Sequence, residues 1–352
     1  MNKTVFSLIV LFLISSLFSF SQDISSGIES SNEIQFAEID EHVRNCPNEI
    51  KSDANKLISY FDEVCTSDIE KARAIYIWLT DNISYDAKSI NKNKFGDNSA
   101  EGVLKSKKGV CAGYSNLFEF FGKKMGLEIL QVAGYSKNAE DEQEWYFVGE
   151  EPGHAWNAIR IEGEWKVFDA TWGAGNGDTD RRGKLVFTKK YKEDWFNLDP
   201  YAAIFTHYPE DTSLMFVHPK ITLEEYEKFP NVGTLAFTSG LLSAKESYLH
   251  SVKKPTVKYP VIYDMDLDGF RVLKSPKTLR MKRRKEHVFE FKVNNLVNIY
   301  LYENDDLKDT FIKDEDGTNF KYEYMSKETS KIDIVIETAD GELFTLMEYE
   351  HY

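Results

Sequence analysis

Three side chains in this 352-residue sequence have the types that a thiol nucleophile requires: Cys111, His154 and Asp169. Cys111 follows Gly109-Val110 and stands at the start of a predicted helix, where unpaired backbone N–H groups and the helix dipole favour an anion. A thiolate in that place has a lowered pKa and is a usable nucleophile. A lone cysteine is more commonly a small buried hydrophobic residue, so Cys111 does not define a site by itself.

The other two residues lie on predicted strands that are joined by Glu162-Gly163. If these two residues form a two-residue turn, Ile161 pairs with Glu164 and the register places His154 and Asp169 on one face, about 7–8 Å apart as diagonal neighbours. A three-residue loop would place them on opposite faces. A carboxylate orients an imidazole, and an imidazole is the base that a thiol needs. The combination favours a Cys–His–Asp triad over a core histidine and a capping aspartate.

Helices and strands to carry these residues follow from the hydrophobic pattern. Ser67 and Glu70 form a capping box that opens the second helix, and Gly126 is a stop signal for the third. Helices followed by antiparallel strands indicate an α+β fold. A Gly-rich polar stretch at Gly173–Gly183 is expected to be a loop. The expected elements are helices at Lys51–Val64, Ser67–Ile83 and Cys111–Met125, and strands at Ile129–Tyr135, His154–Ile161 and Trp165–Ala170.

The motifs around the three residues resemble the transglutaminase-like superfamily. The resemblance covers about Ile69 to Asp211, and the last block is similar to the kyphoscoliosis-peptidase branch, in which a β-sandwich often follows. The matching blocks are Cys111-Ala112-Gly113-Tyr114-Ser115, Gly153-His154-Ala155-Trp156-Asn157, Trp165-Lys166-Val167-Phe168-Asp169-Ala170-Thr171-Trp172, the upstream Ala72–Leu79 and Ile83–Asp86, and Phe205-Thr206-His207-Tyr208-Pro209-Glu210-Asp211.

This resemblance implies a papain-like core in which Cys111 attacks an amide carbonyl and forms a thioester. His154 would act as base and then as acid, and Asp169 would orient it. The backbone N–H of Cys111 and a second donor, for which Tyr85 is the candidate, would stabilise the oxyanion. His207 is expected to be structural. Water as acceptor gives hydrolysis, and an amine gives a crosslink; the residues do not choose between the two acceptors. No cofactor and no metal are expected.

Beyond about Leu223 the pattern changes to short alternating runs separated by turns, which indicates an immunoglobulin-like β-sandwich. The expected fold class is therefore α+β, a transglutaminase-like (papain-like) core followed by an Ig-like β-sandwich domain. The expected divisions are a signal peptide at 1–21, a loosely tied leader at 22–48, the core at 49–215, and a linker with the sandwich at 216–352.

The net charge and the N-terminal segment limit which partners and which cellular location are expected. A net charge of -15 with a pI near 5.1 argues against nucleic acid as a partner. Lys3, the apolar run from Val5 to Phe20 and the small-x-small Ser19-Phe20-Ser21 predict a signal peptide, too short for a membrane anchor. The chain is thus expected to be exported to the periplasm, the cell surface or the medium. Cys46 and Cys65 could pair there or remain two buried thiols.

Two weaker signals and one alternative function remain. Asp264–Gly269 matches the first half of a calcium loop, but Ser275 stands where the bidentate glutamate belongs, so a hairpin turn is the better interpretation. The basic cluster within Lys277–Lys285 is typical of a solvated strand edge. The expected partner is a protein or peptide substrate. The alternative function is a catalytically silent peptide-binding or adhesion module. Oligomeric state does not follow from the sequence.

Overall fold

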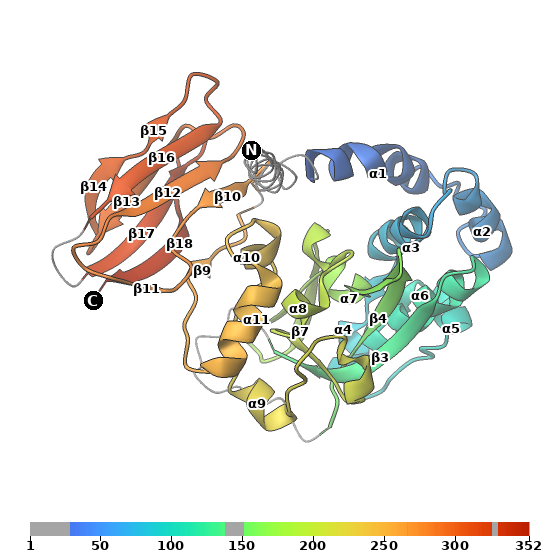
Figure 1. The fold of residues 1–352 in the computed structure, drawn as a ribbon. Coiled ribbons are helices and arrows are strands. Elements are labelled where there is room, and N and C mark those ends of the chain that lie inside the picture. Colours follow the sequence, from blue (N-terminus) through green and yellow to red (C-terminus); the bar gives the residue numbers. More distant parts are fainter. Residues whose placement is uncertain (1–28, 138–150, 266, 326–329, 352) are drawn as a thin grey trace, which may run out of the picture.

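Helices that carry the motifs come first along the chain in the computed structural model, which describes residues 29–137, 151–265, 267–325 and 330–351 (Figure 1). The central helix is α3 (Asp68–Asn82), and the predicted capping box of Ser67 and Glu70 forms its start. All nine residues from Ala72 to Thr80 are buried, so α3 is surrounded by other elements on every side. Helices α2 (Ala54–Asp62) and α6 (Cys111–Lys124) pack against it, and α5 (Ala100–Ser106) packs against α6.

A four-stranded sheet faces these helices, with the strand order β5-β4-β3-β8. The register of the β4–β5 hairpin is the one predicted from its turn, because Ile161 pairs with Glu164. Both turn residues have positive φ, 50° at Glu162 and 86° at Gly163, as a two-residue hairpin loop requires. The strands are β3 (Ile129–Ser136), β4 (His154–Ile161), β5 (Glu164–Phe168) and β8 (His207–Pro209).

The expected loosely tied leader is wrong for residues 29–44, which form helix α1 (Glu29–Arg44) against α3. Arg73 of α3 is 5% exposed and donates from Nε and Nη2 to the two carboxylate oxygens of Asp40, each at 2.8 Å. The guanidinium also lies over the rings of Phe36 and Phe196. A buried bidentate ion pair with apolar packing holds this helix in place, although its polar sequence gives little helical periodicity.

The Gly-rich stretch after the triad is also more ordered than expected. Helix α7 (Ala170–Gly173) is followed by β6 (Gly175–Thr179), which pairs with β7 (Leu185–Lys189) in a hairpin. Backbone pairing makes this hairpin, and the polar side chains conceal it from sequence patterns. Short elements complete this part of the chain: β1 (Ser84–Tyr85), α4 (Ala87–Asn91), β2 (Lys108–Gly109), η1 (Glu193–Trp195), α8 (Pro200–Ala203) and η2 (Thr212–Met215).

A second hydrophobic core begins at Ile204 and continues to Tyr349. Small helices come first, and two sheets follow with the orders β10-β12-β16-β15 and β11-β18-β17-β13-β14. Phe289 and Phe291 of the first sheet and Ile332, Ile334 and Ile336 of the second lie in this one core. The elements are α9 (Leu223–Glu227), α10 (Leu235–Thr238), α11 (Ala244–Lys253), β9 (Val261–Ile262), β10 (Arg271–Lys274), β11 (Arg280–Met281), β12 (His287–Lys292), β13 (Asn298–Glu303), β14 (Asp306–Thr310), β15 (Ile312–Lys313), β16 (Asn319–Tyr324), β17 (Ser330–Glu337) and β18 (Leu343–His351).

The N-terminal segment expected to be a signal peptide lies outside the described residues. Among the residues that are described, no helix has the length and apolar character needed to cross a membrane.

Candidate active site

Cys111 is the first residue of α6, and the chain before it is held from two sides. Strand β2 pairs with β1, with Gly109 opposite Tyr85. The Asn98 side chain accepts a 3.1 Å hydrogen bond from the backbone N–H of Val110, the N-cap. The thiol is therefore presented at the helix N-terminus, as the sequence predicts, and Cys111 is partly exposed.

Hydrogen bonds between α6 and β4 bring the cysteine to the histidine. Ser115 lies one turn after Cys111, and its hydroxyl donates to the carbonyl of Trp156 at 2.9 Å. Asn157 donates from Nδ2 to the carbonyl of Ser115 at 3.2 Å and so ties β4 to α6. As a result the Cys111 sulfur lies 4.0 Å from the carbonyl oxygen of Gly153, the residue before His154. His154 is therefore close enough to the thiol to lower its pKa.

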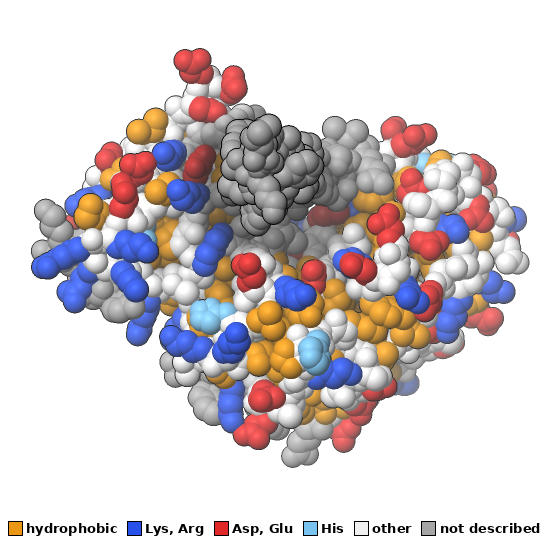
Figure 2. All heavy atoms as spheres, viewed as in Figure 1, with side chains coloured by type: hydrophobic (Ala, Val, Ile, Leu, Met, Phe, Trp, Pro, Cys, Tyr) orange, Lys and Arg blue, Asp and Glu red, His pale blue; other side chains and the backbone are white. Residues whose placement is uncertain are grey.

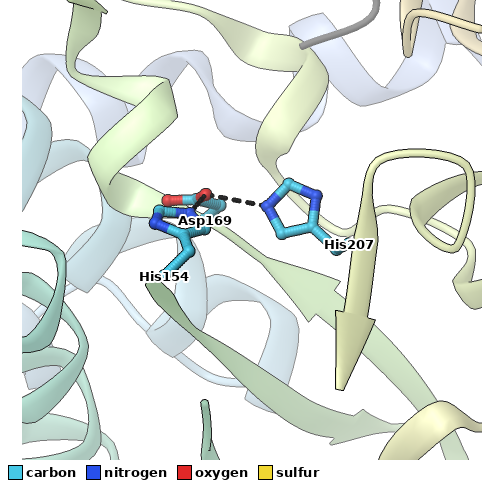
Figure 3. Close-up of side chains that lie close together, drawn as sticks. All are labelled: His154, Asp169 and His207. Carbon is cyan, nitrogen blue, oxygen red and sulfur yellow. Dashed lines mark hydrogen bonds and ion pairs between the residues drawn. The ribbon is translucent and has the colours of Figure 1, made fainter. Parts of the chain in front are cut away.

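Asp169 is the third residue of the candidate triad, and Figure 3 shows it next to His154. His154 Nε2 lies 2.6 Å from Asp169 Oδ2, and both side chains are buried. Because an ionised carboxylate only accepts, Nε2 carries the proton in this bond. The other carboxylate oxygen accepts from the backbone N–H groups of Thr171 at 2.8 Å and Trp172 at 3.0 Å, so Asp169 is also the N-cap of α7. The structure thus brings together the three residues that the sequence predicts to form a triad.

A second histidine enters from β8. His207 Nε2 lies 3.1 Å from the same Oδ2 of Asp169 that His154 contacts, and Figure 3 shows the two rings meeting the carboxylate from different directions. On the far side of this ring, Nδ1 lies 2.8 Å from the Thr206 hydroxyl. His207 and Thr206 are 2% and 1% exposed. The sequence predicts only a structural role for His207. The block Thr206-His207-Tyr208-Pro209 is the one sequence signal that could have identified it as a residue of the site.

The charges of the site favour a thiolate and an imidazolium. Burial raises the pKa of the Cys111 thiol, but the hydrogen bond and charge of His154 outweigh it and hold this pKa below its ordinary value. For His154, burial acts against the charged form, while the Asp169 carboxylate raises the pKa to about 10. Asp169 is also buried, yet its hydrogen bonds to His154 and His207 keep its pKa well below the usual range. Burial lowers the pKa of His207, which stays neutral.

Tyr85, the candidate oxyanion donor, lies at the same end of the site. It sits on β1, opposite the residue that precedes Val110 and Cys111 in β2. Burial, followed by the negative charges of Cys111 and Asp169, raises the pKa of its phenol. The phenol therefore keeps its proton and remains a hydrogen-bond donor next to the thiolate.

Three tryptophans enclose the histidines. Trp172 stacks on His154 at a ring-centroid distance of 5.2 Å. His207 contacts Trp156, Trp172 and Trp195 at centroid distances of 4.8, 4.6 and 5.2 Å. Trp78, a residue of α3, is instead fully buried in the first core. The aromatic box restricts both imidazoles to the orientations seen.

His154, Asp169 and His207 are also the one group within the described residues whose ligand atoms, all within 4.8 Å, could hold a metal ion. Both imidazole nitrogens already lie at hydrogen-bond distance from Oδ2, at 2.6 and 3.1 Å. A metal would have to replace the protons in these two bonds. The geometry therefore fits a hydrogen-bonded cluster better than a metal centre.

The remaining sequence signals lie away from the triad. Asp264 of the calcium-like segment pairs with Lys192, and Asp268 accepts from Asn294. The basic cluster occupies the edge strand β11 and the turn after it, with Arg283 and Arg284 exposed. Figure 2 shows Lys and Arg side chains gathered along the lower left of the C-terminal sheets. Cys46 and Cys65 are buried and unpaired.

Residues 55–170 match the family model described as the transglutaminase-like superfamily, so the first core of this chain contains a transglutaminase-like domain. Kyphoscoliosis peptidase of Mus musculus is 33% identical over 195 residues, which is 55% of this chain and 29% of the mouse protein. Hillarin of Drosophila melanogaster is 29% identical over 226 residues, 61% of this chain and 27% of Hillarin. These matches support the kyphoscoliosis-peptidase branch.

The chain spans less than a third of the length of these curated relatives. A solved structure entitled "Crystal structure of a TGase" aligns with a TM-score of 0.28 and 20% identity, over 51% of this chain and 41% of the other.

Proposed function

We propose that this protein, which contains a transglutaminase-like domain, is an exported cysteine enzyme that acts on amide bonds of proteins or peptides through a thioester on Cys111. The observation that carries the proposal is the placement of the Cys111 sulfur 4.0 Å from the carbonyl oxygen of Gly153, next to His154, whose Nε2 lies 2.6 Å from Asp169. The thiol pKa is lowered by His154, and the imidazole pKa is raised to about 10. Both shifts favour a thiolate and an imidazolium, which are the nucleophile and the acid that amide cleavage requires.

The first half-reaction needs three events. The Cys111 thiolate adds to the amide carbon, and the carbonyl oxygen becomes an oxyanion that accepts from the backbone N–H of Cys111 and from the Tyr85 phenol. His154 is oriented by Asp169 through Nε2, so its Nδ1 side faces the thiol and the scissile bond. It gives its proton to the leaving nitrogen, the C–N bond breaks, and an acyl-thioester and a free amine remain.

The second half-reaction returns the site to its starting state. Neutral His154 takes a proton from the incoming acceptor, which adds to the thioester carbon and expels the thiolate. Water as acceptor gives a carboxylic acid, whereas a primary amine gives a new amide. The name of the mouse relative, a peptidase, favours water for this chain too.

We also propose a location and a substrate-binding role for the second core. The apolar N-terminal run supports export, and the acidic net charge of -15 argues against nucleic acid as a partner. The second core, with two sheets over one set of buried aromatic and branched residues, supports an immunoglobulin-like sandwich that would present or bind substrate.

The test is to trap the thioester. The mature chain is mixed with a peptide library containing internal amides and glutamine, quenched in acid, and analysed by intact mass and by peptide mapping. We expect an acyl adduct on Cys111 that is absent in Cys111→Ala and retained in Cys65→Ala. Cys65 is a suitable control because burial raises its pKa to about 12. Adding a fluorescent primary amine then separates hydrolysis from transfer. If reduced, alkylatable enzyme formed no adduct and turned over no peptide, the silent binding module would replace this proposal.

A further inference from the structure

We propose that His207 is a fourth, positioning member of the site, a neutral imidazole that donates its Nε2–H to Asp169 and so holds the carboxylate in place for His154. This inference rests on the proposed function for its catalytic meaning. It concerns the same reacting thiol but assigns a residue outside the triad.

The carboxylate of Asp169 is held at both oxygens. Oδ1 accepts from two backbone N–H groups of the first turn of α7, at 2.8 and 3.0 Å. Oδ2 accepts from His154 at 2.6 Å and from His207 at 3.1 Å. Without His207, Oδ2 would keep His154 as its one partner among the described residues, and His154 is the residue that Asp169 has to orient. His207 therefore supplies an anchor that does not change its protonation during the reaction.

The protonation of His207 follows from its surroundings. Nε2 must carry a proton to meet an ionised carboxylate, and a neutral ring then leaves Nδ1 as an acceptor. The Thr206 hydroxyl lies 2.8 Å from Nδ1 and 3.2 Å from the carbonyl oxygen of Ala203, and it has one proton to donate. The contact to Nδ1 is the shorter one, and a neutral His207 that donates from Nε2 needs a donor at Nδ1. By donating to Nδ1, Thr206 helps to select this tautomer, in the way that an outer partner orients a functional histidine.

A neutral His207 avoids charge repulsion with the His154 imidazolium. The two ring centroids are 5.3 Å apart, so a charged His207 would repel the His154 imidazolium. The charged groups that face His207 are Asp169 and His154, and its other ring neighbours are the three tryptophans. Burial holds the pKa of His207 below its ordinary value, so one imidazole of the pair stays neutral while the other carries the charge.

The fold is built to bring β8 this close. Strand β8 pairs with β3, which in turn pairs with β4, so His207 and His154 project from strands on either side of β3. Gly134 on β3 makes the approach feasible, because a Cβ there would lie 2.2 Å from the backbone oxygen of Tyr208 and 2.6 Å from the Trp156 ring. Tyr208, the next residue on β8, points to the second core instead. One face of β8 therefore serves the site, and the other serves packing.

Removal of the His207 donor should change the protonation equilibrium between Cys111 and His154. Asp169 would lose one of its hydrogen bonds and would hold His154 less firmly, so the thiolate–imidazolium pair would be less populated. Loss of one hydrogen bond to a charged group corresponds to a decrease of roughly ten- to a hundredfold. We expect that decrease in the rate of Cys111 alkylation at pH 6, together with an upward movement of the apparent thiol pKa.

The experiment measures iodoacetamide alkylation of Cys111 between pH 5 and 10 by mass spectrometry, in the full mature chain and without substrate. His207→Phe removes the donor and keeps an aromatic ring. His207→Gln keeps an N–H at a similar position, and we expect it to retain most of the wild-type profile. Thr206→Val removes the tautomer-selecting hydroxyl and should show a smaller movement in the same direction. Tyr208→Leu, on the opposite face of β8, is the matched control for destabilisation and should keep the wild-type midpoint.

An unchanged alkylation midpoint in folded His207→Phe would overturn the inference, and so would an equal loss in His207→Gln. If the His207 variants do not fold, Thr206→Val decides: an unshifted profile refutes the role and a shifted one supports it. The experiment distinguishes failure of this inference from failure of the proposed function. If the chain turns over no amide but shows these alkylation shifts, the role of His207 stands and the proposed function is wrong. If turnover is normal but the His207→Phe profile is unshifted, the proposed function stands and the role of His207 is wrong.

Discussion

Replacing Asp169 with asparagine tests the electrostatics of the site more sharply than deleting any residue. The change keeps the size of the side chain but replaces two acceptor oxygens with one oxygen and one NH2 group. In the structure both oxygens accept, one from two backbone N–H groups and the other from two imidazoles. Whichever way the amide turns, its NH2 group therefore faces two donors.

Each orientation has a defined consequence. With the NH2 group toward the histidines, both rings must give up the Nε2 proton, and neutral His154 then carries its proton on Nδ1. That proton faces Cys111, so the ring cannot accept the thiol proton. With the NH2 group toward α7, the helix loses its N-cap, which costs about 1 kcal/mol or more of stability. In both cases the imidazolium loses its negative partner.

The size of the effect follows from the pKa of His154. Burial opposes its charge, and Asp169 is the leading cause that raises the pKa from 6.5 to about 10. At 1.36 kcal/mol for each pKa unit, loss of that whole shift is worth roughly 5 kcal/mol, or between three and four orders of magnitude in the thiolate–imidazolium population. We expect Asp169→Asn to lower amide turnover about a thousandfold and to return the thiol pKa to about 8.5 or higher.

The assay is the pH profile of Cys111 alkylation, with circular dichroism to verify folding. Asp199→Asn is the control, because Asp199 caps α8 through its side chain in the same manner and is exposed. It should keep the wild-type profile. A folded Asp169→Asn protein with a wild-type thiol pKa would show that the Asp169 charge does not stabilise the pair, and the reasoning would be refuted.

Three further changes have defined outcomes. Tyr85→Phe should lower amide turnover by about a hundredfold without moving the alkylation profile, because only the oxyanion loses a donor; unchanged turnover would remove Tyr85 from the oxyanion site. Asp40→Asn should lower the free energy of unfolding in urea by about 2–3 kcal/mol, since buried Arg73 then keeps Glu193 as its one acidic partner among the described residues. The exposed Glu41→Gln should change this free energy little, and equal effects of the two variants would contradict the stabilising role of the Asp40–Arg73 ion pair. Gly134→Ala should force β8 away from β3 and lower both stability and turnover, and a structure with β8 unmoved would contradict this.

Local chemistry explains what the sequence predicted well. The Glu162-Gly163 turn sets the register of β4 and β5 by itself, and that register places His154 and Asp169 on one face. The start of α6 is likewise visible from Gly109 and the apolar pattern after Cys111. Such features depend on neighbours in sequence, so a single sequence carries them.

Long-range contacts explain what was missed. His207 is 38 residues from Asp169, and its approach depends on the pairing of β8 with β3, which no local pattern encodes. Helix α1 is held by a salt bridge between Asp40 and Arg73, 33 residues apart, while its own sequence is polar. Buried polar partners are set by tertiary structure, so composition and periodicity do not identify them.

The central claim, that Cys111 is a thiolate held by a charged His154, is tested most directly by alkylation against pH in wild type and His154→Gln. We expect wild type to react with an apparent pKa well below the free-thiol value of about 8.5, because the imidazolium stabilises the thiolate from below neutral pH until His154 loses its proton near pH 10. Amide turnover should fall above that same pH, since the acid is then absent. In His154→Gln the low pKa should disappear. A wild-type thiol that titrates at 8.5 or above, or one that is unaffected by loss of His154, would contradict the account.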